Sequence, residues 1–479
     1  MDYPTKISHW IGGKEYSSDQ ATIDKHAPAT GNILTKVPSA GAAELARAIA
    51  AAQQGFEQWS HIGIVQRADI LRRAAALLLE KKAEVAEIIM LECGRPRKDV
   101  EGEISAAYEC GMFFAGEGRR LYSSTLQSSN EKRSVTLVRD SIGVGALFTP
   151  FSTPLSQVAW KTFPALLCGN AVILKAHECA PYLPVWFAKV LQEAGVPDGV
   201  YNVLQGTGEG IGTLLSESPA IQFISFTGSS DTGARILEKS AKNLTKVSIE
   251  GGGKNPFIVL ADADLEKACA DGVASAYVDS GQRCAAASRF IVADEVYDAF
   301  LRMFITRAAA LRIGAGEDDD MGAIISEARL NAILAAVESA KKDGATVALG
   351  GARAGAAGYF MQPTVLEEAD PKSPISQTET FGPVALFYRV KGIEEAKQLA
   401  EDSSLRLSSA IHTRDINAAL SFAHEYKSGV VRVNGPTFGS EPHMPFGGPK
   451  RSGNGWREPG PTAIDFYSEL KQISVDRNS

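Results

Sequence analysis

Two segments of the chain carry side chains that could do covalent chemistry. The first is E-G-G-G-K-N-P at Glu250–Pro256, and the second is G-Q-R-C at Gly281–Cys284. Glycine has no Cβ, so the backbone beside Glu250 lets a ligand approach closely. Cysteine is a strong nucleophile toward an electrophilic carbon, and a nearby carboxylate can activate the water that releases the covalent adduct. The pair predicts covalent catalysis. The alternative is that Cys284 is a buried, small, apolar side chain, as most free cysteines are.

Composition narrows the class of protein. The chain has 479 residues, of which 44% are hydrophobic and 22% charged, and its formal net charge is -7. At about 150 residues per domain, this length predicts roughly three structural units, and the negative charge argues against a nucleic-acid-binding protein. No apolar run reaches the roughly 18–20 residues of a membrane span, and the N-terminus has no signal-peptide pattern. The six cysteines form no disulfide framework and the seven histidines show no zinc spacing, so we expect a cytoplasmic protein without a metal site.

The elements that must position these residues begin with a helical region. Apolar residues at helical spacing predict three helices, at Ala42–Gln58, Gln66–Cys93 and Val100–Leu121. A Ser/Thr-rich loop at Ser123–Asn130 and an exposed strand at Ser134–Asp140 follow.

Strands and helices then alternate, which predicts βαβ units in a parallel sheet that binds ligands at the carboxyl ends of its strands. The predicted strands are Ile142–Thr149, Ala171–Lys175, Val200–Leu204 and Gln222–Phe226, with helices at Gln157–Leu167 and Pro184–Ala194. Two strand-to-helix turns are rich in glycine and hydroxyl groups, G-T-G-E-G-I-G at Gly206–Gly212 and F-T-G-S-S at Phe226–Ser230. The first turn alone is a weak signal, because it is one residue longer than the usual dinucleotide fingerprint. Two such turns in one sheet can both hold an anion, and together they favour a nucleotide.

A second α/β region follows Cys284. The predicted helices are Val296–Ala310 and Arg329–Asp343, and the predicted strands are Phe290–Val292, Thr346–Leu349, Pro363–Val365, Val384–Tyr388, Ser409–His412 and Gly429–Val433. Gly435–Gly460 reads as a long glycine- and proline-rich loop, and loops of that length are usually functional. Ala463–Val475 is predicted to be a final strand that pairs across a subunit boundary.

These motifs, in this order, resemble the aldehyde dehydrogenase superfamily over essentially the whole chain. The resemblance implies an α/β fold with a Rossmann-like, parallel-sheet NAD-binding domain (1–122 and 142–252) and a second α/β catalytic domain (253–460). It also implies a small β extension for oligomerisation (123–141 and 461–479) in a homodimer or homotetramer. The implied activity is the NAD(P)-dependent oxidation of an aldehyde to a carboxylic acid.

The resemblance assigns catalytic roles to four residues. Cys284 would attack the aldehyde to form a thiohemiacetal, which becomes a thioester when hydride is lost, and Glu250 would activate the water that hydrolyses it. Lys161 and Glu458 match positions of a proton relay, with lone surface charges as the alternative. A catalytic Cys284 is expected to have a depressed pKa and to react quickly with an alkylating agent.

Other positions match the cofactor site of the family. Lys175 and Glu178, in K-A-H-E, would bind the adenosine ribose, and a carboxylate there favours NAD over NADP because it repels a 2′-phosphate, although NADP stays possible. The remaining predicted cofactor contacts are Thr149, Pro150, Phe151, Gly208, Gly212, Phe226, Gly228, Ser229, Gly252, Glu379 and Phe381.

Three residues depart from the family pattern. P-F-S-T-P stands where the family usually has P-W-N-F-P, so Ser152 replaces the oxyanion-hole asparagine and Thr153 replaces an aromatic residue. Loss of one oxyanion donor costs about 10²–10³ in rate, so slow or unusual chemistry is one expectation. Gly251 stands where leucine is common, which is expected to add local backbone freedom.

Substrate signals conflict. Arg283 could pair with an anionic substrate or with a protein carboxylate. The loop Gly435–Met444, which includes His443, resembles members that act on aromatic aldehydes, whereas G-N-G-W-R-E-P-G at Gly453–Gly460 resembles semialdehyde dehydrogenases. Trp160 and Phe446 could pack on either kind of substrate.

Two other functions stay open from the sequence. The first is a CoA-acylating dehydrogenase, against which Glu250 argues because water activation would compete with transfer to CoA. The second is a binding or structural protein with vestigial catalysis, for which Ser152 is the one favourable feature.

Overall fold

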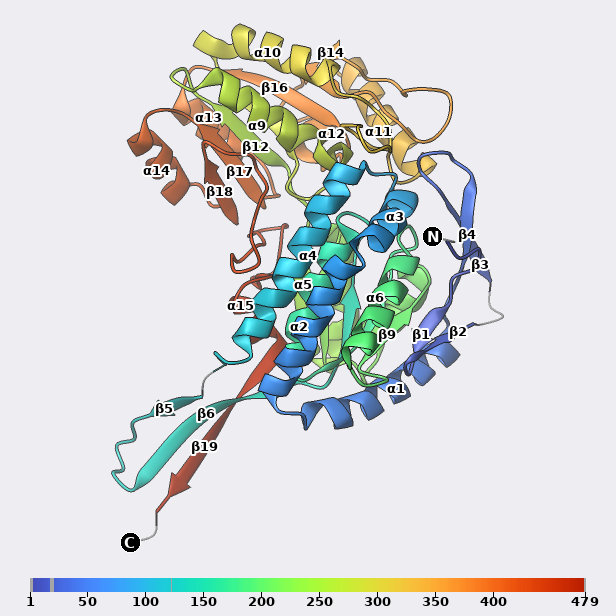
Figure 1. The fold of residues 1–479 in the computed structure, drawn as a ribbon. Helices are drawn as coiled ribbons and strands as arrows, with labels where there is room; N and C mark the ends of the chain where they lie inside the picture. Colours follow the sequence, from blue (N-terminus) through green and yellow to red (C-terminus); the bar gives the residue numbers. More distant parts are fainter. Residues whose placement is uncertain (1–2, 18–20, 122, 478–479) are drawn as a thin grey trace.

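The computed structural model describes residues 3–17, 21–121 and 123–477. Within these residues the strands form two seven-stranded sheets, a three-stranded sheet and a two-stranded hairpin. Figure 1 shows the two large sheets in the body of the molecule with helices packed around them, and the three-stranded sheet projecting from it as an arm. The predicted α/β class, with two parallel-sheet units and a small β extension, is confirmed.

The first sheet is parallel through its centre. Its strand order is β11-β10-β7-β8-β9-β1-β2, with β1 and β2 antiparallel at one edge. The strands are β1 (His9–Ile11), β2 (Lys14–Tyr16), β7 (Val144–Phe148), β8 (Ala171–Lys175), β9 (Tyr201–Leu204), β10 (Phe223–Thr227) and β11 (Lys246–Glu250). β7 to β10 are buried along their whole length, as expected for parallel strands covered on both faces. From β7 the chain proceeds to β8 and β9 on one side, then returns to place β10 and β11 on the other, so the strand order reverses at β7.

The helices that cover this sheet come mainly from the N-terminal part of the chain (Figure 1). They are α1 (Ala42–Ser60), α2 (Ile64–Glu80), α3 (Lys82–Cys93), α4 (Arg97–Glu117), α5 (Pro154–Leu167), α6 (Tyr182–Ala194), α7 (Thr213–Glu217) and α8 (Ser230–Ser240). Short helical turns stand at Gly208–Gly212 and Ala241–Asn243. A two-stranded hairpin, β3 (Thr22–His26) and β4 (Ile33–Pro38), lies outside the sheet.

The second sheet carries the region after Glu250. Its order is β14-β15-β16-β13-β12-β17-β18, parallel except for the β14–β15 pair. The strands are β12 (Asn255–Val259), β13 (Ala287–Ala293), β14 (Thr346–Leu349), β15 (Thr364–Glu367), β16 (Val384–Val390), β17 (Ser408–His412) and β18 (Val430–Val433). The helices are α9 (Leu265–Tyr277), α10 (Asp294–Ala309), α11 (Glu327–Lys342), α12 (Pro374–Gln377), α13 (Ile393–Glu401) and α14 (Ile416–Glu425), with a helical turn at Val278–Gly281.

The arm consists of β5 (Ser124–Leu126), β6 (Arg133–Ser141) and β19 (Ser468–Asp476), all antiparallel. β6 and β19 pair over nine residues, from Ser141 opposite Ser468 to Arg133 opposite Asp476. Each of the three larger sheets takes all its strands from one predicted unit: the first sheet from 1–122 and 142–252, the second from 253–460, and the arm from 123–141 and 461–479. The domain boundaries themselves stay a prediction.

Several predicted elements differ from the structure. The single helix predicted over Gln66–Cys93 is two helices, because Lys81 leaves helical geometry (φ -97°, ψ 18°) between α2 and α3. The predicted final strand begins with a short helix, α15 (Thr462–Tyr467), whose apolar side chains are buried, and only Ser468 onward is strand. The predicted loop Ser123–Asn130 contains β5, and the four N-terminal strands and the strands flanking Gly251–Gly253 were not predicted. No helix within the described ranges is long and apolar enough to cross a membrane.

Candidate active site

A cavity of about 1070 Å³ lies at the carboxyl ends of the parallel strands of the first sheet. Residues that follow β7, β8 and β10 line it, so it sits where the strand order reverses, the usual ligand site of such sheets. Every predicted cofactor residue lines the cavity: Thr149, Pro150, Phe151, Lys175, Glu178, Gly208, Gly212, Phe226, Gly228, Ser229, Gly252, Glu379 and Phe381. Ser152 and Cys284 line the same cavity.

The polar groups at one end of this cavity fit the phosphates and ribose of a dinucleotide. The Ser229 hydroxyl accepts a hydrogen bond from the Thr232 N–H (3.3 Å) at the start of α8, and helix starts favour anions. Lys175 Nζ lies 3.1 Å from a Glu178 carboxylate oxygen. Although burial opposes it, the nearby His177 and Lys175 lower the pKa of Glu178 to about 2, so this carboxylate is charged.

At the other end of the cavity, the backbone at Gly252 and Gly253 lies close to the Glu379 carboxylate. A Cβ on Gly252 would lie 2.1 Å from Glu379 Oε2, so any side chain at position 252 would displace that carboxylate. Glu379 Oε1 accepts a hydrogen bond from the Gly253 N–H (3.0 Å), and burial raises the pKa of Glu379 to about 7. Phe381 has a left-handed backbone (φ 50°), rare for a bulky residue, and its ring meets Phe151 edge-to-face at 5.6 Å. Such local strain is typical of ligand sites.

The segment that presents Cys284 is held by its backbone. Asp279 and Ser280 both have left-handed φ (56° and 57°), so the chain turns sharply just before the thiol. The Asn255 side chain, at the start of β12, donates to the carbonyls of Cys284 (2.7 Å) and Ala286 (2.9 Å). The position of the thiol is therefore fixed from both sides.

The expectation of a depressed pKa for Cys284 is wrong. Burial raises the pKa of Cys284 to about 12, and the carboxylates of Glu250 and Glu379 raise it further, while Arg283 lowers it less. The resting side chain is thus a thiol, and its proton must leave as the sulfur attacks.

Glu250 is the last residue of β11 and is buried. Its Oε2 accepts a hydrogen bond from the Thr227 hydroxyl (3.1 Å), whereas Oε1 has no partner among the described residues. Burial raises the pKa of Glu250 to about 8, with Lys161 opposing and Glu458 adding to the shift. A buried carboxyl oxygen without a partner is costly, and a water is a natural occupant.

Lys161 and Glu458 are buried together rather than exposed as lone surface charges. Lys161 Nζ donates to Glu458 Oε2 (2.9 Å) and to the Ser225 hydroxyl (2.7 Å). The hydroxyls of Ser225 (2.7 Å) and Tyr467 (2.9 Å) both donate to Glu458 Oε1. Ser225 and Tyr467 were missed from the sequence. The signal for Ser225 was a hydroxyl inside the predicted strand Gln222–Phe226, on the same face as Thr227 once β10 extends to that residue.

Ser152 and Thr153 form the turn between β7 and α5. Thr153 has a left-handed backbone (φ 46°), an outlier for a β-branched residue. Directly after it, the N–H groups of Leu155 (2.7 Å) and Ser156 (3.1 Å) donate to Glu103 Oε1. A carboxylate thus caps the first turn of α5, three and four residues after Ser152.

The predicted substrate residues fall into two groups. Trp160 and Phe446 meet edge-to-face at 5.8 Å and pack in one apolar cluster with Cys284 and Phe438. Arg283 lies over the Phe438 ring (4.7 Å), and its Nε is 3.4 Å from an Asp279 oxygen. His443 is 54% exposed beside Phe113 (6.5 Å) and outside that cluster.

Gly251 does not add freedom to the backbone. A Cβ there would lie 2.5 Å from the Arg451 carbonyl oxygen and 2.9 Å from the Ser230 hydroxyl. The Gly251 N–H also donates to the Ser452 carbonyl (3.0 Å). The absence of a side chain lets the Gly435–Gly460 loop pack against the residue after Glu250.

Comparison with known proteins gives a consistent result. The model of the aldehyde dehydrogenase family matches residues 16–473. An alpha-ketoglutarate semialdehyde dehydrogenase of Haloferax volcanii is 37% identical over 436 residues, covering 90% of each chain. An NADP(+) succinate-semialdehyde dehydrogenase of Escherichia coli is 35% identical, covering 95% of this chain and 94% of its own.

A solved structure agrees with these sequences. Betaine aldehyde dehydrogenase of Staphylococcus aureus, in complex with NAD+, superposes with a TM-score of 0.95 at 31% identity, covering 98% of this chain and 95% of its own. The family model, which matches residues 16–473, includes Cys284, Glu250 and all the residues that line the cavity. The chain belongs to the aldehyde dehydrogenase family.

Proposed function

We propose that this chain oxidises an aldehyde to a carboxylic acid through a covalent adduct on Cys284, which water activated by Glu250 then releases. The observation that carries this proposal is the pairing of a thiol on the cavity with a buried carboxylate close enough to raise the pKa of Cys284. The unpartnered Oε1 of Glu250 supports hydrolysis by water rather than transfer of the acyl group to CoA.

The chain's own residues carry the first half of the reaction. Sγ of Cys284 bonds to the aldehyde carbon, and its proton moves to the aldehyde oxygen, which gives a thiohemiacetal. The Cys284 N–H and the Ser152 hydroxyl would donate to that oxygen as charge develops on it. A nicotinamide cofactor bound in the cavity would accept the hydride from the thiohemiacetal carbon, and the hydroxyl proton would be lost to solvent, which leaves a thioester.

The second half needs a base. Ionised Glu250 takes a proton from water as the water oxygen bonds to the thioester carbon, and the C–S bond breaks. The sulfur leaves and takes up the proton that Glu250 holds, which restores the thiol and the ionised carboxylate, and the acid departs. Lys161, Glu458 and Ser225 are hydrogen-bonded to one another, and the charges of Lys161 and Glu458 act on Glu250, the first lowering its pKa and the second raising it.

For the cofactor we propose a preference for NAD. The charged Glu178 and its partner Lys175 would hold the adenosine ribose, and the carboxylate would repel a 2′-phosphate. The turn at Gly208–Gly212 and the start of α8 would hold the pyrophosphate, with Glu379 and Phe381 at the nicotinamide side.

For the substrate we propose an aldehyde that carries a carboxylate. Both curated relatives described above are dehydrogenases of dicarboxylic semialdehydes by name. Arg283 belongs to the loop of the thiol and is partly exposed, and its contacts with Asp279 and Phe438 leave guanidinium N–H groups for a second anion. The aromatic wall of Trp160, Phe438 and Phe446 would exclude water from the carbon chain of the substrate.

Arg283→Gln tests this substrate class. Hydrogen bonds to charged groups contribute about 1.5–3 kcal/mol, so we expect KM for succinic semialdehyde to rise by roughly 10-fold or more. KM for butanal, which has the same length and no charge, should stay within about twofold. Equal changes for both aldehydes would exclude Arg283 as the anion-binding group.

A larger donor at position 152 should speed the reaction on simple aldehydes. Ser152→Asn restores a side chain that reaches further toward the oxyanion, and one such donor contributes about 10²–10³ in rate. We expect kcat on short aliphatic aldehydes to rise by about 10-fold, measured as initial rates at saturating cofactor. An unchanged or lower kcat would mean that the Ser152–Thr153 turn is fitted to serine.

The direct test of the proposed function is NADH formation, followed by absorbance, across a small panel. The panel holds carboxylate-bearing semialdehydes, an aromatic aldehyde and short aliphatic aldehydes, each with NAD and with NADP. We expect the highest kcat/KM for a semialdehyde with NAD. A higher value for the aromatic aldehyde would contradict the substrate class, a higher value with NADP would contradict the role of Glu178, and no reduction of either cofactor would contradict the function.

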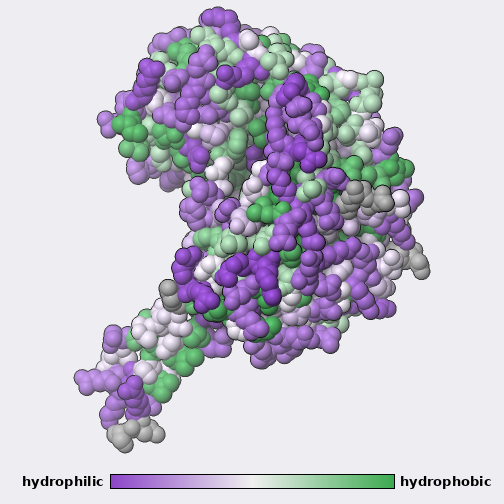
Figure 2. All heavy atoms as spheres, viewed as in Figure 1, coloured by the Kyte–Doolittle hydropathy of each residue, from purple (hydrophilic) through white to green (hydrophobic). Residues whose placement is uncertain are grey.

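We also propose that the chain forms a homo-oligomer through the arm. Four apolar side chains are exposed on the arm. Leu126 and Val475 lie near its tip, and Leu470 (61% exposed) and Ile473 lie between the tip and the body. Figure 2 shows a hydrophobic stretch where the arm meets the body. An apolar surface on a projecting sheet is typical of an interface. Sedimentation of the full chain measures this, and a monomer of 51.0 kDa at micromolar concentration would contradict it.

A further inference from the structure

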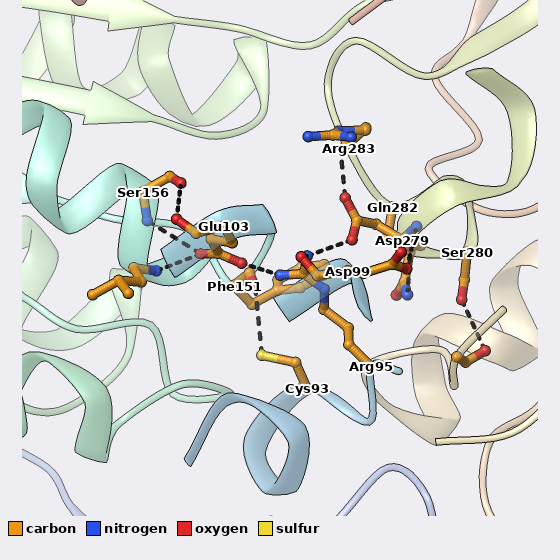
Figure 3. A network of polar contacts seen from close by, with 12 residues as sticks. Cys93, Arg95, Asp99, Glu103, Phe151, Ser156, Asp279, Ser280, Gln282 and Arg283 are labelled. Atoms are coloured by element: carbon orange, nitrogen blue, oxygen red, sulfur yellow. Dashed lines mark hydrogen bonds and ion pairs between the residues drawn. The ribbon is translucent and has the colours of Figure 1, made fainter. Parts of the chain in front are cut away.

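A buried arginine connects the two loops of the active site. Arg95 follows α3 in the short turn before α4, and it is only 5% exposed. Its guanidinium forms ion pairs with Glu103 on one side and with Asp279 (2.5 Å) on the other. Figure 3 shows Arg95 lying between these two carboxylates, with Arg283 beyond Asp279.

Each carboxylate is attached to a different catalytic loop. Glu103 accepts the N–H groups of Leu155 and Ser156, directly after the Ser152–Thr153 turn. Asp279 stands five residues before Cys284, at the left-handed turn that presents the thiol, and also pairs with Arg283. The connected groups therefore run from the helix start beside Ser152 to the loop of Cys284.

The neighbouring residues of the same turn strengthen this link. Cys93 Sγ donates to the carbonyl of Phe151 (3.7 Å), the residue before Ser152, as Figure 3 shows. The Gly94 carbonyl accepts a hydrogen bond from the Ala323 N–H (2.8 Å), and the Ala323 carbonyl accepts one from the Gln282 side chain (3.0 Å). Cys93 and Gly94 thus reach the same two loops that Arg95 joins.

Charge and geometry both require arginine at position 95. The Asp279 oxygens lie 2.5 Å from the Arg95 guanidinium and 3.4 Å from that of Arg283, but neither oxygen accepts a well-aligned hydrogen bond. The attraction is therefore mainly electrostatic. Arginine presents its N–H groups in a rigid, planar fork that can engage two carboxylates at once, whereas a lysine ammonium is a single point of charge. A buried ion pair adds little net stability because desolvation opposes it, so its value here is the geometry that it fixes.

We propose that Arg95 is a positioning residue that holds the Ser152 loop and the Cys284 loop at the separation needed for attack on the aldehyde. The proposal rests on the proposed roles of Cys284 and Ser152. Arg95 itself touches neither residue. It acts through Glu103 and Asp279, and a displacement of about 1 Å between reacting groups costs on the order of 10² in rate.

Two substitutions test this proposal. Arg95→Lys keeps the charge and loses the fork. Asp279→Asn keeps the size of the side chain and suits the left-handed backbone, but removes the charge on the side of the Cys284 loop and leaves the Arg95–Glu103 pair intact. The matched control is Arg67→Lys, because Arg67 is also buried (8% exposed) and, among the described residues, donates only to backbone carbonyls of Leu167, Ile62 and Ser60.

The measurements are amide hydrogen exchange of the protein without cofactor or substrate, and steady-state kinetics. For Arg95→Lys and Asp279→Asn we expect faster exchange in both 151–156 and 279–284, unchanged exchange in α2, and a kcat at least about 10-fold lower with KM for NAD within twofold. Arg67→Lys should change neither loop.

The proposal is overturned if both variants keep parental exchange in the two loops and kcat within twofold. If Arg95→Lys exchanges faster throughout the chain, its fold has been damaged, and Asp279→Asn alone decides. Hydrogen exchange is measured without any reaction, so it tests the link between the two loops independently of catalysis. Activity in Cys284→Ala would contradict the proposed function but would leave this test of Arg95 unchanged.

Discussion

Replacing Cys284 by alanine abolishes NADH formation, lowering kcat by at least about 10⁴-fold. Without Sγ the aldehyde carbon has no nucleophile, and no thiohemiacetal forms. Removal of a covalent nucleophile from a comparable active site costs on the order of 10⁶ in kcat. Absorbance of NADH at saturating aldehyde and NAD measures this, and NAD binding, followed by fluorescence quenching, should stay within about twofold.

Cys269→Ala is the matched control. Cys269 is a buried cysteine on α9 in the core of the same α/β unit, whereas Cys284 is partly exposed to the cavity, and Cys269 lies outside the residues that line it. Its variant should keep kcat within about twofold. NADH formation by Cys284→Ala at more than a few per cent of the parental rate would mean that another group attacks the aldehyde.

The second large effect is expected at Glu250. In Glu250→Gln the thioester still forms, because Cys284 is intact, but no carboxylate takes the proton of the attacking water. We expect one NADH per active site in a rapid first turnover, followed by a steady-state rate at least about 10²–10³-fold lower. Stopped-flow absorbance separates the two phases.

The pH dependence follows from the same group. Burial raises the pKa of Glu250 to about 8, so the side chain is mainly neutral at pH 7 and ionised above pH 8. A base must be ionised to act, so the rate of thioester hydrolysis in the parent should rise as pH increases through about 8 and level off above it. Glu250→Gln should lose that rise.

Glu92→Gln, at another fully buried glutamate with a pKa raised to about 7, should keep both the parental rate and the pH profile. A first turnover without NADH in Glu250→Gln would instead place Glu250 before hydride loss.

Much of the site could be predicted because its signals are local. Glycines next to Glu250 and a cysteine among small residues stand out in the sequence, and the apolar strands β7 to β10 read as a buried parallel sheet. Parallel strands bring their carboxyl ends to one edge, so residues that follow different strands had to meet there. The residues that follow β7, β8, β9 and β10 were therefore expected together, whereas Glu379 and Phe381, between α12 and β16, were assigned only by resemblance to the family.

Groups that act through the tertiary structure could not be predicted. The pKa of Cys284 depends on burial and on Glu250 and Glu379, which come near it only in the folded chain, and the prediction from the sequence had the wrong sign. Arg95 and Asp279 are 184 residues apart in a chain with no pattern that pairs them. The helix α15 was predicted as strand because it is short and apolar, and such segments carry no clear period.

The most direct test of the account is the mass of the Cys284 peptide after Glu250→Gln has been mixed with NAD and a semialdehyde and quenched in acid. We expect an adduct on Cys284 with the mass of the aldehyde less two hydrogens, the composition of a thioester, formed in step with one NADH per active site. The adduct should not form in Cys284→Ala and should not accumulate to the same level in the parent. NADH formation in Glu250→Gln with an unmodified Cys284 would contradict covalent catalysis by this residue.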